Sequence, residues 1–262
     1  MRPIADLPDA VSRGVRLMFC DIDDTLTTHG KLDREAFDAL WRLRDAAIKV
    51  VPVTGRPAGW CDAIVRQWPV DAVVGENGAF VFHEVAGVLK ARFHAQAMSN
   101  RDELAAVRDT ILKEVPGSRV AKDQHYRLFD LAIDFAEEDP KLDLAAADRI
   151  RAIAERLGCV AKVSSIHVNI WLGGYDKLSM ARETARHLFG IDDAALASQA
   201  FFVGDSPNDA PMFAAFPHSA GVANIARFVA SMRHLPAYVA SQPGGRGFAE
   251  VASVLLGARG VC

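Results

Sequence analysis

The fold is decided by the stretch Phe19–Thr27, FCDIDDTLT, in which an apolar run from Val15 to Cys20 ends in the carboxylates Asp21, Asp23 and Asp24. A short, mostly apolar run of this kind is typical of a buried strand. Unpaired carboxylates do not enter such a core, because an isolated buried charge is costly. The acids are therefore expected at the carboxyl end of a buried strand.

The first part of the chain alternates strand and helix patterns. The expected elements are a strand at Val15–Ile22, a helix at Asp33–Ala47, a strand at Lys49–Val53, a helix at Pro57–Gln67 and a strand at Ala72–Val74. This βαβαβ order predicts a parallel sheet. Polar residues follow the three strands, namely Asp21, Thr54 and Glu76. Because ligands bind beyond the carboxyl ends of parallel strands, we expect these three positions to converge.

The middle of the chain has a different pattern, which predicts an α+β insert with its own sheet. Its expected elements are a hairpin at Gly78–Phe93, helices at Arg101–Glu114 and Leu142–Leu157, and strands at Leu128–Phe135, Val160–Val163 and His167–Leu172. The βα pattern then resumes with a helix at Asp176–Phe189, a strand at Ala200–Val203, a helix at Asp209–Ala215 and short strands near Ala220 and Tyr238. We expect an α/β fold with a parallel-sheet core at 1–83 and 176–262 and an inserted domain at 84–175.

Composition excludes several classes of protein. The 262 residues are 50% hydrophobic and 24% charged, enough for one large or two modest globular domains. A net charge of −3, without a basic tail, argues against nucleic acid or a membrane surface as the main partner. The four cysteines form no CxxC pair, which disfavours a disulfide framework and favours a reducing cytoplasm. We expect neither export nor a membrane anchor, since the first fifteen residues lack an apolar signal segment.

A second strand end carries acids later in the chain, at Gly204–Asp209, GDSPND. This stretch lacks the final glycine of the G-x-S-x-G nucleophile elbow, so it does not indicate a serine hydrolase. The first acidic stretch is not an EF-hand, because Leu26 and Leu32 stand where that loop needs Gly and Glu. Taken alone, Asp-x-Asp-x-Thr is also typical of a solvated strand end. Two acidic strand ends in one sheet repel each other unless a cation lies between them, and several oxygen ligands favour Mg²⁺.

These strand ends supply the parts of a phosphoryl-transfer site. A carboxylate can attack phosphorus and form an aspartyl-phosphate when Mg²⁺ and an ammonium group offset the repulsion between the two anions. Asp21 is the candidate nucleophile, and Asp23 is the candidate general acid and base. The Thr54 hydroxyl and the Gly55 N–H are candidate phosphoryl ligands, and Lys177 opens a later helix from which it supplies positive charge.

In this order the motifs resemble those of the haloacid dehalogenase superfamily of phosphohydrolases. The matching segments are DIDDT at Asp21–Thr25, VTGR at Val53–Arg56, Lys177, which matches by context alone, and GDSPND at Gly204–Asp209. The stretch Glu76–Ala79, ENGA, and the insert at 84–175 are similar to the subfamily with a large α/β cap inserted after the third core strand. The resemblance implies a Rossmann-like core, a cap domain and the activity of a phosphatase.

The resemblance also implies roles for the motif residues. Asp21 is expected as nucleophile, and Asp23 as acid and base that also binds the metal through its backbone carbonyl. The metal-binding candidates are Asp21, Asp23, Asp205 and Asp209, of which Asp209 either binds directly or positions the others. The phosphate-binding candidates are Thr54, Gly55, Lys177 and Asn208. The expected cofactor is Mg²⁺, and the expected substrate is a small phosphorylated metabolite, with a sugar phosphate favoured.

Other functions remain open. The superfamily contains dehalogenases, but these dispense with the metal and the second Asp, so the retained Asp23, Asp205 and Asp209 favour phosphoryl transfer. A phosphohexomutase of the same architecture is the main alternative. A phospho-acceptor signalling protein also places acids and a lysine at strand ends, but the large insert and the spacing of Asp23 weigh against it.

The specificity candidates are Arg56, Asn77, Arg127, His167 and Asn169. Each has a structural alternative: a surface arginine for Arg56, turn chemistry for Asn77, a solvated loop for Arg127 and a partly buried sheet face for His167 and Asn169. Trp60 and Trp68 lie at helical spacing and are expected to fill the core. The sequence indicates neither the natural substrate nor the oligomeric state.

Overall fold

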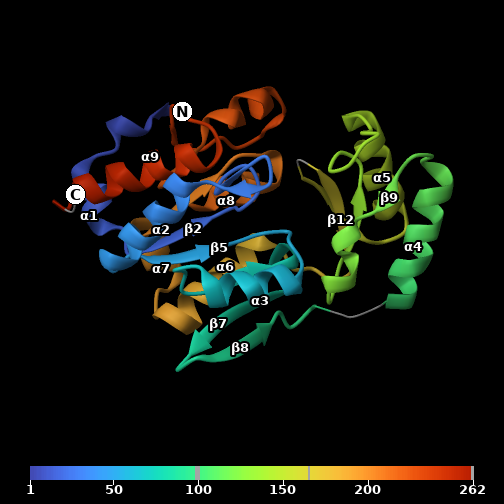
Figure 1. Cartoon of the computed structure of the whole chain (residues 1–262), viewed down its shortest axis with the longest axis horizontal. Helices are drawn as coiled ribbons and strands as arrows, with labels where there is room; N and C mark the ends of the chain where they lie inside the picture. The colour runs from blue at the N-terminus through green and yellow to red at the C-terminus, as the bar shows by residue number, and fades with distance from the viewer. Residues whose placement is uncertain (98–100, 165, 261–262) are drawn as a thin grey trace.

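The computed structural model describes residues 1–97, 101–164 and 166–260. Figure 1 shows two lobes: a core, which carries both chain ends, and a cap, coloured green to yellow, at its side. No helix in the described ranges has both the length and the apolar composition needed to cross a membrane.

The core is built on a six-stranded sheet with the order β1-β15-β14-β13-β2-β5, and all of its pairings are parallel. Its strands are β1 (Arg2–Pro3), β2 (Leu17–Cys20), β5 (Lys49–Pro52), β13 (Ala200–Gly204), β14 (Ser219–Gly221) and β15 (Tyr238–Val239). The central strands β2 and β13 are buried along their whole length, which explains their apolar runs. The predicted parallel sheet is confirmed.

Helices cover both faces of this sheet. Alternate residues of β2 belong to two different apolar clusters, one packed by α2, α3 and α9 and the other by α6, α7 and α8. These helices are α2 (Arg34–Asp45), α3 (Ala58–Gln67), α6 (Lys177–Phe189), α7 (Asp193–Gln199), α8 (Ala210–Ala215) and α9 (Gly244–Gly257), with α1 (Asp9–Gly14) beside α9. The 3₁₀ segments of the core are η1 (Ile4–Asp6), η2 (Glu76–Gly78), η4 (Pro207–Asp209) and η5 (Ala223–Ser231).

A three-stranded sheet continues the core beyond β5. Its strands are β6 (Val73–Gly75), β7 (Phe80–Val85) and β8 (Val88–Phe93), joined to the main sheet by a parallel bridge between Val53 and Val74. The expected hairpin within Gly78–Phe93 is confirmed, and its turn lies at Ala86-Gly87. The expected domain boundary at residue 84 falls inside this hairpin.

The cap is an antiparallel sheet with helices on one face. The strand order is β11-β12-β10-β9, formed by β9 (Arg119–Val120), β10 (Leu131–Asp134), β11 (Val160–Val163) and β12 (His167–Trp171). Helices α4 (Arg101–Glu114) and α5 (Leu144–Arg156) share an apolar cluster with the sheet, and η3 (Lys122–Tyr126) follows β9. The other face of the sheet turns to the core, as the contacts of Asn169 show below.

Several elements were not predicted. They include β1, β9, α1, α7, α9, the 3₁₀ segments η1, η3 and η5, and a small hairpin of β3 (Thr27–Thr28) and β4 (Lys31–Leu32) after the acidic stretch. The strand expected at Leu128–Phe135 is shorter, because residues 128–130 bond to the side chain of Glu76 instead of to a neighbouring strand.

Candidate active site

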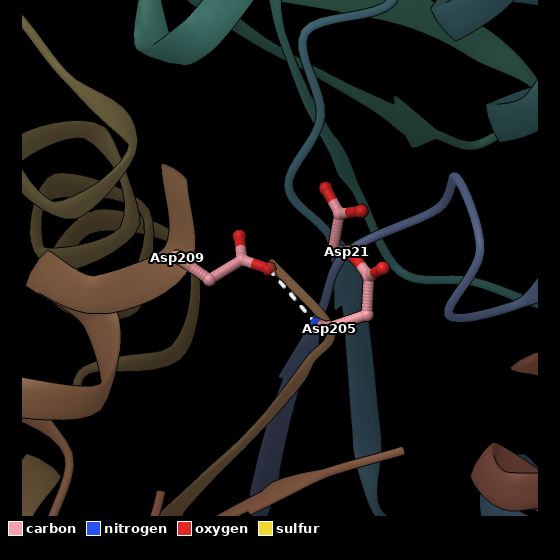
Figure 2. A group of neighbouring side chains, drawn as sticks. All are labelled: Asp21, Asp205 and Asp209. Atoms are coloured by element: carbon pink, nitrogen blue, oxygen red, sulfur yellow. Dashed lines mark hydrogen bonds between the residues drawn. The ribbon is translucent and has the colours of Figure 1, made fainter. Parts of the chain in front are cut away.

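Parallel pairing brings the two acidic strand ends together. Cys20 of β2 pairs with Val203 of β13, so Asp21 and Asp205 emerge side by side, and the Asp21 N–H donates to the Val203 carbonyl at 2.9 Å. Figure 2 shows the carboxylates of Asp21, Asp205 and Asp209 gathered at these strand ends. All three residues are buried, and one carboxylate oxygen from each lies within 4.8 Å of the others.

Lys177 lies inside this acidic group. Its Nζ is 2.7 Å from Asp21 Oδ1 and 2.9 Å from Asp209 Oδ1. The other oxygen of Asp209 accepts hydrogen bonds from the backbone N–H groups of Asp205 and Ser206 at 3.1 and 3.4 Å. Both oxygens of Asp209 are thus occupied, and they fix the ammonium group and the Asp205 backbone in place.

The helix that carries Lys177 reaches this position through two local features. Asp176 caps α6 by accepting from the Ser179 N–H at 2.8 Å. Gly78 of the ENGA stretch has a φ of +108°, and a side chain there would overlap the Asp176 carbonyl. Only glycine lets η2 and the start of α6 come this close.

The group carries more negative than positive charge. Three carboxylates face one ammonium group, and burial, more than the neighbouring carboxylates, raises the pKa of Asp21 to about 7. Burial raises the pKa of Asp205 well above its usual range. Burial alone would lower the pKa of Lys177, but Asp209 and Asp21 raise it. Asp205 Oδ1 is buried and has no hydrogen-bond partner among the described residues. These oxygens fit a divalent cation, which would supply the missing charge and a partner for Asp205.

Two residues from η5 also hold the acidic group, and they were missed at the sequence level. Asn224 Nδ2 donates to Asp205 Oδ2 at 2.8 Å and to the Asp24 carbonyl at 3.1 Å. Arg227 lies 3.4 Å from the Asp24 carboxylate and 3.7 Å from that of Asp205. A signal existed for Asn224, because it follows β14 at the same edge of the sheet as the other polar strand ends.

Arg56 links Asp23 to the cap. Its Nη2 lies 2.8 Å and its Nε 3.0 Å from the oxygens of Asp23, while its Nη1 lies 3.4 Å from Glu137 and 3.6 Å from Asp123. His167 Nε2 is 2.8 Å from the other oxygen of Glu137. The hydrogen bond from His167 and the charge of Arg56 lower the pKa of Glu137 to about 2.

Trp60 lies on the outside of Arg56. The prediction that it fills the core is wrong, since it is 41% exposed and its ring centroid lies 4.4 Å from the Arg56 guanidinium carbon. Trp68 is half-buried and packs against the core. The helical spacing of eight residues does not give both indoles the same environment, because α3 ends at Gln67.

A narrow pocket lies between the strand ends and the cap sheet. Of the predicted site residues, it brings together Asp21, Asp23, Gly55, Arg56, Asn77, His167, Asn169 and Asn208. Lys162, Ser164, Ile166 and Ser206 complete its lining. None of these four was among the predicted site residues, although Ser206 lies within the GDSPND stretch.

The remaining predicted residues do not line this pocket. Lys177, Asp205 and Asp209 are buried and bonded as described above. Thr54 is fully buried, and its hydroxyl oxygen accepts from the Arg56 N–H at 3.0 Å. Arg127 is also buried, and its guanidinium group bonds to Asp123, Asp130 and the Gly55 carbonyl.

Arg127 belongs to a second buried polar group, here called the core–cap joint: Glu76, Asn77, Asp123, Arg127, Asp130 and Asn169. Arg127 Nη1 lies 2.8 Å from Asp130 Oδ1 and 2.9 Å from the Gly55 carbonyl oxygen. Asn77 Nδ2 and Asn169 Nδ2 both reach the other Asp130 oxygen, at 3.3 and 3.4 Å.

Glu76 is the centre of the joint. Its two carboxylate oxygens accept four backbone N–H groups, one from Ala58 at the start of α3 and three from Leu128, Phe129 and Asp130 of the cap. Burial and the charge of Asp130 nevertheless raise its pKa to about 7. Through these bonds the third core strand end, which the sequence analysis expected at the site, holds the cap in place.

The sequences that this chain is similar to are consistent with the acidic strand-end site described above. Residues 18–106 match the family model described as haloacid dehalogenase-like hydrolase. A phosphoglycolate phosphatase of Pyrobaculum neutrophilum is 27% identical over 93% of this chain and 96% of its own length, and one of Pyrobaculum aerophilum is 28% identical over 92% and 96%.

Solved structures share the fold over nearly the whole chain. A protein of Thermoplasma acidophilum is similar with a TM-score of 0.71 at 19% identity, covering 94% of this chain and 98% of its own. The sucrose-phosphatase of Synechocystis sp. PCC6803 gives a TM-score of 0.63 at 17% identity, covering 92% and 98%. The family match over residues 18–106, the parallel core with its cap and the acidic strand ends agree with one another: this chain is similar to hydrolases of the haloacid dehalogenase superfamily.

Proposed function

We propose that the protein is a Mg²⁺-dependent phosphomonoester hydrolase that forms an aspartyl-phosphate on Asp21. The observation that carries the proposal is the meeting of Asp21, Asp205 and Asp209 oxygens within 4.8 Å, with Lys177 bonded to Asp21. Mg²⁺, held by Asp21, Asp205 and the backbone carbonyl of Asp23, would supply the charge that lets a phosphate dianion approach these carboxylates.

The proposed reaction has two steps. An Asp21 oxygen attacks phosphorus, the bond from phosphorus to the leaving oxygen breaks, and Asp23 gives that oxygen its proton. Asp23, now a carboxylate, then takes a proton from water, and the water oxygen attacks the phospho-aspartate. The bond between phosphorus and Asp21 breaks, which releases phosphate and restores the carboxylate.

The other residues bind and position. The Gly55 N–H, Asn208, Lys177 and the Thr54 hydroxyl are proposed phosphoryl ligands. Arg56 holds the Asp23 carboxylate where the leaving group departs. Because both oxygens of Asp209 already accept hydrogen bonds, we assign it the positioning of Lys177 and Asp205.

The proposed substrate is a small phosphorylated metabolite. The pocket is narrow and polar, and the Pyrobaculum relatives carry the name phosphoglycolate phosphatase. We also propose that residues 84–175 act as a cap on a catalytic core of 1–83 and 176–262, and that the protein works in the cytoplasm.

The test is phosphate release from p-nitrophenyl phosphate and a panel of phosphorylated metabolites, with and without Mg²⁺. Asp21→Asn should lower kcat by at least about 10⁴-fold with an unchanged circular dichroism spectrum, because the nucleophile is lost. Asp23→Asn should turn over slowly and accumulate phospho-enzyme, detected by intact mass after an acid quench. Mg²⁺-dependent release by Asp21→Asn at the wild-type rate would refute the nucleophile assignment.

The two alternatives have their own signatures. A mutase converts a hexose 1-phosphate to the 6-phosphate when a trace of bisphosphate is present, without releasing phosphate. A phospho-acceptor protein takes up one phosphoryl group and hydrolyses it slowly. Rapid multiple-turnover release of free phosphate contradicts both.

A further inference from the structure

The cap side of the pocket presents two neighbouring side chains of opposite hydrogen-bonding character. Lys162 of β11 and Asn169 of β12 are directly paired in register, so their side chains lie on the same face of the sheet. Both line the pocket that also contains Asp21 and Asp23. Lys162 offers an ammonium donor, and Asn169 offers an amide.

Lys162 differs from the other basic side chains of the pocket. Arg56 is bonded to Asp23, Asp123 and Glu137, and His167 to Glu137. The side chain of Lys162 makes no hydrogen bond or ion pair within the described ranges of the chain. It also lines a cleft of about 1050 Å³ that shares Asp23 and Arg56 with the pocket and is lined further by residues of α5 and η5. Its charge is therefore available to the part of a substrate beyond the phosphoryl group.

Asn169 presents an unused acceptor. Its Nδ2 donates to the Gly55 carbonyl at 3.0 Å and to Asp130 Oδ2 at 3.4 Å. Both partners are acceptors, so the amide can be oriented in only one way, with Oδ1 turned from them. Oδ1 is buried and has no partner among the residues that the structure describes. A phosphate dianion or a carboxylate cannot satisfy it, because neither has a proton to donate, whereas a hydroxyl group can.

We propose that Lys162 and Asn169 form the leaving-group subsite and that the substrate is a phosphorylated hydroxy acid. Its carboxylate binds Lys162 Nζ, and its neighbouring hydroxyl donates to Asn169 Oδ1. This inference rests on the proposed phosphatase function and narrows its substrate, which the sequence analysis expected to be a sugar phosphate. Directly paired positions on neighbouring strands match a carboxylate and a hydroxyl that are attached to the same carbon.

The test uses three matched phosphomonoesters in Mg²⁺. They are 3-phosphoglycerate, glycerol 3-phosphate, in which a neutral CH₂OH replaces the carboxylate, and 3-phosphooxypropanoate, which lacks only the hydroxyl. In the wild-type enzyme, kcat/KM for 3-phosphoglycerate should exceed that for glycerol 3-phosphate by about 10- to 100-fold, the worth of one charge-assisted hydrogen bond. It should exceed that for 3-phosphooxypropanoate by about 5-fold or more, because the buried acceptor is then unpaired.

Lys162→Gln should reduce the ratio between 3-phosphoglycerate and glycerol 3-phosphate to within about threefold of unity. Lys113→Gln is the matched control, since it removes the same charge from α4 of the cap at a residue that lines neither cavity, and it should leave the ratio unchanged. An equal loss of kcat/KM for both substrates in Lys162→Gln would mean that this lysine binds the phosphoryl group, and would overturn the proposal.

The wild-type ratios test the proposal without any variant. A kcat/KM for glycerol 3-phosphate equal to or above that for 3-phosphoglycerate overturns it, even if p-nitrophenyl phosphate is hydrolysed and Asp21→Asn is inactive, so the phosphatase function would stand. If no ester, p-nitrophenyl phosphate included, releases phosphate in Mg²⁺, the proposed function fails and this inference fails with it.

Discussion

The acidic group at the strand ends and the core–cap joint are both buried clusters of charge, yet they are completed in different ways. In the joint, the oxygens of Glu76, Asp123 and Asp130 all have hydrogen-bond donors. In the acidic group, the ammonium group of Lys177 bonds to Asp21 and Asp209, and Asp205 Oδ1 has no partner in the part of the chain that the structure describes. A cluster whose carboxylate oxygens are all paired stabilises the structure, whereas one with an unpaired carboxylate oxygen is ready to bind a ligand.

This difference predicts that substitutions in the two clusters have opposite effects on activity and on stability. A change in the acidic group should cost activity and spare the fold, because it removes uncompensated charge. A change in the joint should cost stability, because it leaves buried donors unpaired. The predictions below run from the largest expected effect to the smallest.

Asp205→Asn should have the largest effect, on activity. We expect kcat/KM to fall by roughly 10³-fold, since charge stabilisation by a bound metal is worth several kcal/mol. The free energy of unfolding without metal should rise by roughly 1 kcal/mol, because one buried negative charge is gone. Phosphate release and urea unfolding in EDTA measure the two quantities, with Asp45→Asn on the exposed end of α2 as the control. Loss of both activity and stability in Asp205→Asn would contradict the proposed difference between the acidic group and the joint.

Glu76→Gln should show the reverse pattern. The amide keeps one acceptor oxygen and turns an NH₂ group toward backbone N–H donors, so two of the four hydrogen bonds are lost. We expect the free energy of unfolding to fall by roughly 2–4 kcal/mol, with kcat of the folded enzyme within about fivefold of wild type. Urea unfolding compared with Glu84→Gln on the exposed part of β7 provides the measurement. A loss no larger than in that control would show that the joint does not hold the cap.

The acidic group was largely predictable from the sequence, and the joint was not. The geometry of a parallel sheet brings the carboxyl ends of its strands together, whatever the rest of the fold is. The residues of the acidic group lie at these strand ends or at the start of a helix beside them: Asp21, Lys177, Asp205 and Asp209. The partners of Glu76 and Arg56 lie in the cap, and which of its residues meet them depends on how two separately packed lobes dock. No local pattern encodes that docking, so Lys162 and Glu137 were missed.

Local signals also failed where packing overrides propensity. Helix α9 was not predicted, because glycines at 244, 245 and 247 disfavour a helix start. The structure needs these glycines: a Cβ on Gly245 would lie 2.6 Å from the Leu26 carbonyl oxygen, since the helix begins against the loop after the acidic stretch. A tertiary contact thus sets the residue choice at the start of this helix.

Mg²⁺ should stabilise the acidic group and leave the joint unaffected. At a concentration 100-fold above its Kd, a bound ion adds about 2.7 kcal/mol to the free energy of unfolding. We expect this gain in the wild type and in Glu76→Gln, but not in Asp205→Asn. Urea unfolding in Mg²⁺ and in EDTA gives the difference for each protein. An equal gain in Asp205→Asn would place the ion elsewhere.

The smallest change per step of the titration is a pH dependence of stability that arises in the joint. Burial and the charge of Asp130 raise the pKa of Glu76 to about 7, whereas a glutamate in an unfolded chain titrates near 4.3. Between these values the folded state keeps a proton that the unfolded state has released. The free energy of unfolding should therefore fall as the pH rises from about 4.5 to 7, by at most about 1.4 kcal/mol per pH unit. Glu76→Gln does not titrate, so its urea-unfolding profile should be flatter than that of wild type over this range. If the slope in Glu76→Gln equals that of wild type, the pH dependence arises in the acidic group, where burial also raises the pKa of Asp21. The same urea-unfolding profile measured on Asp205→Asn separates the contributions of the two clusters.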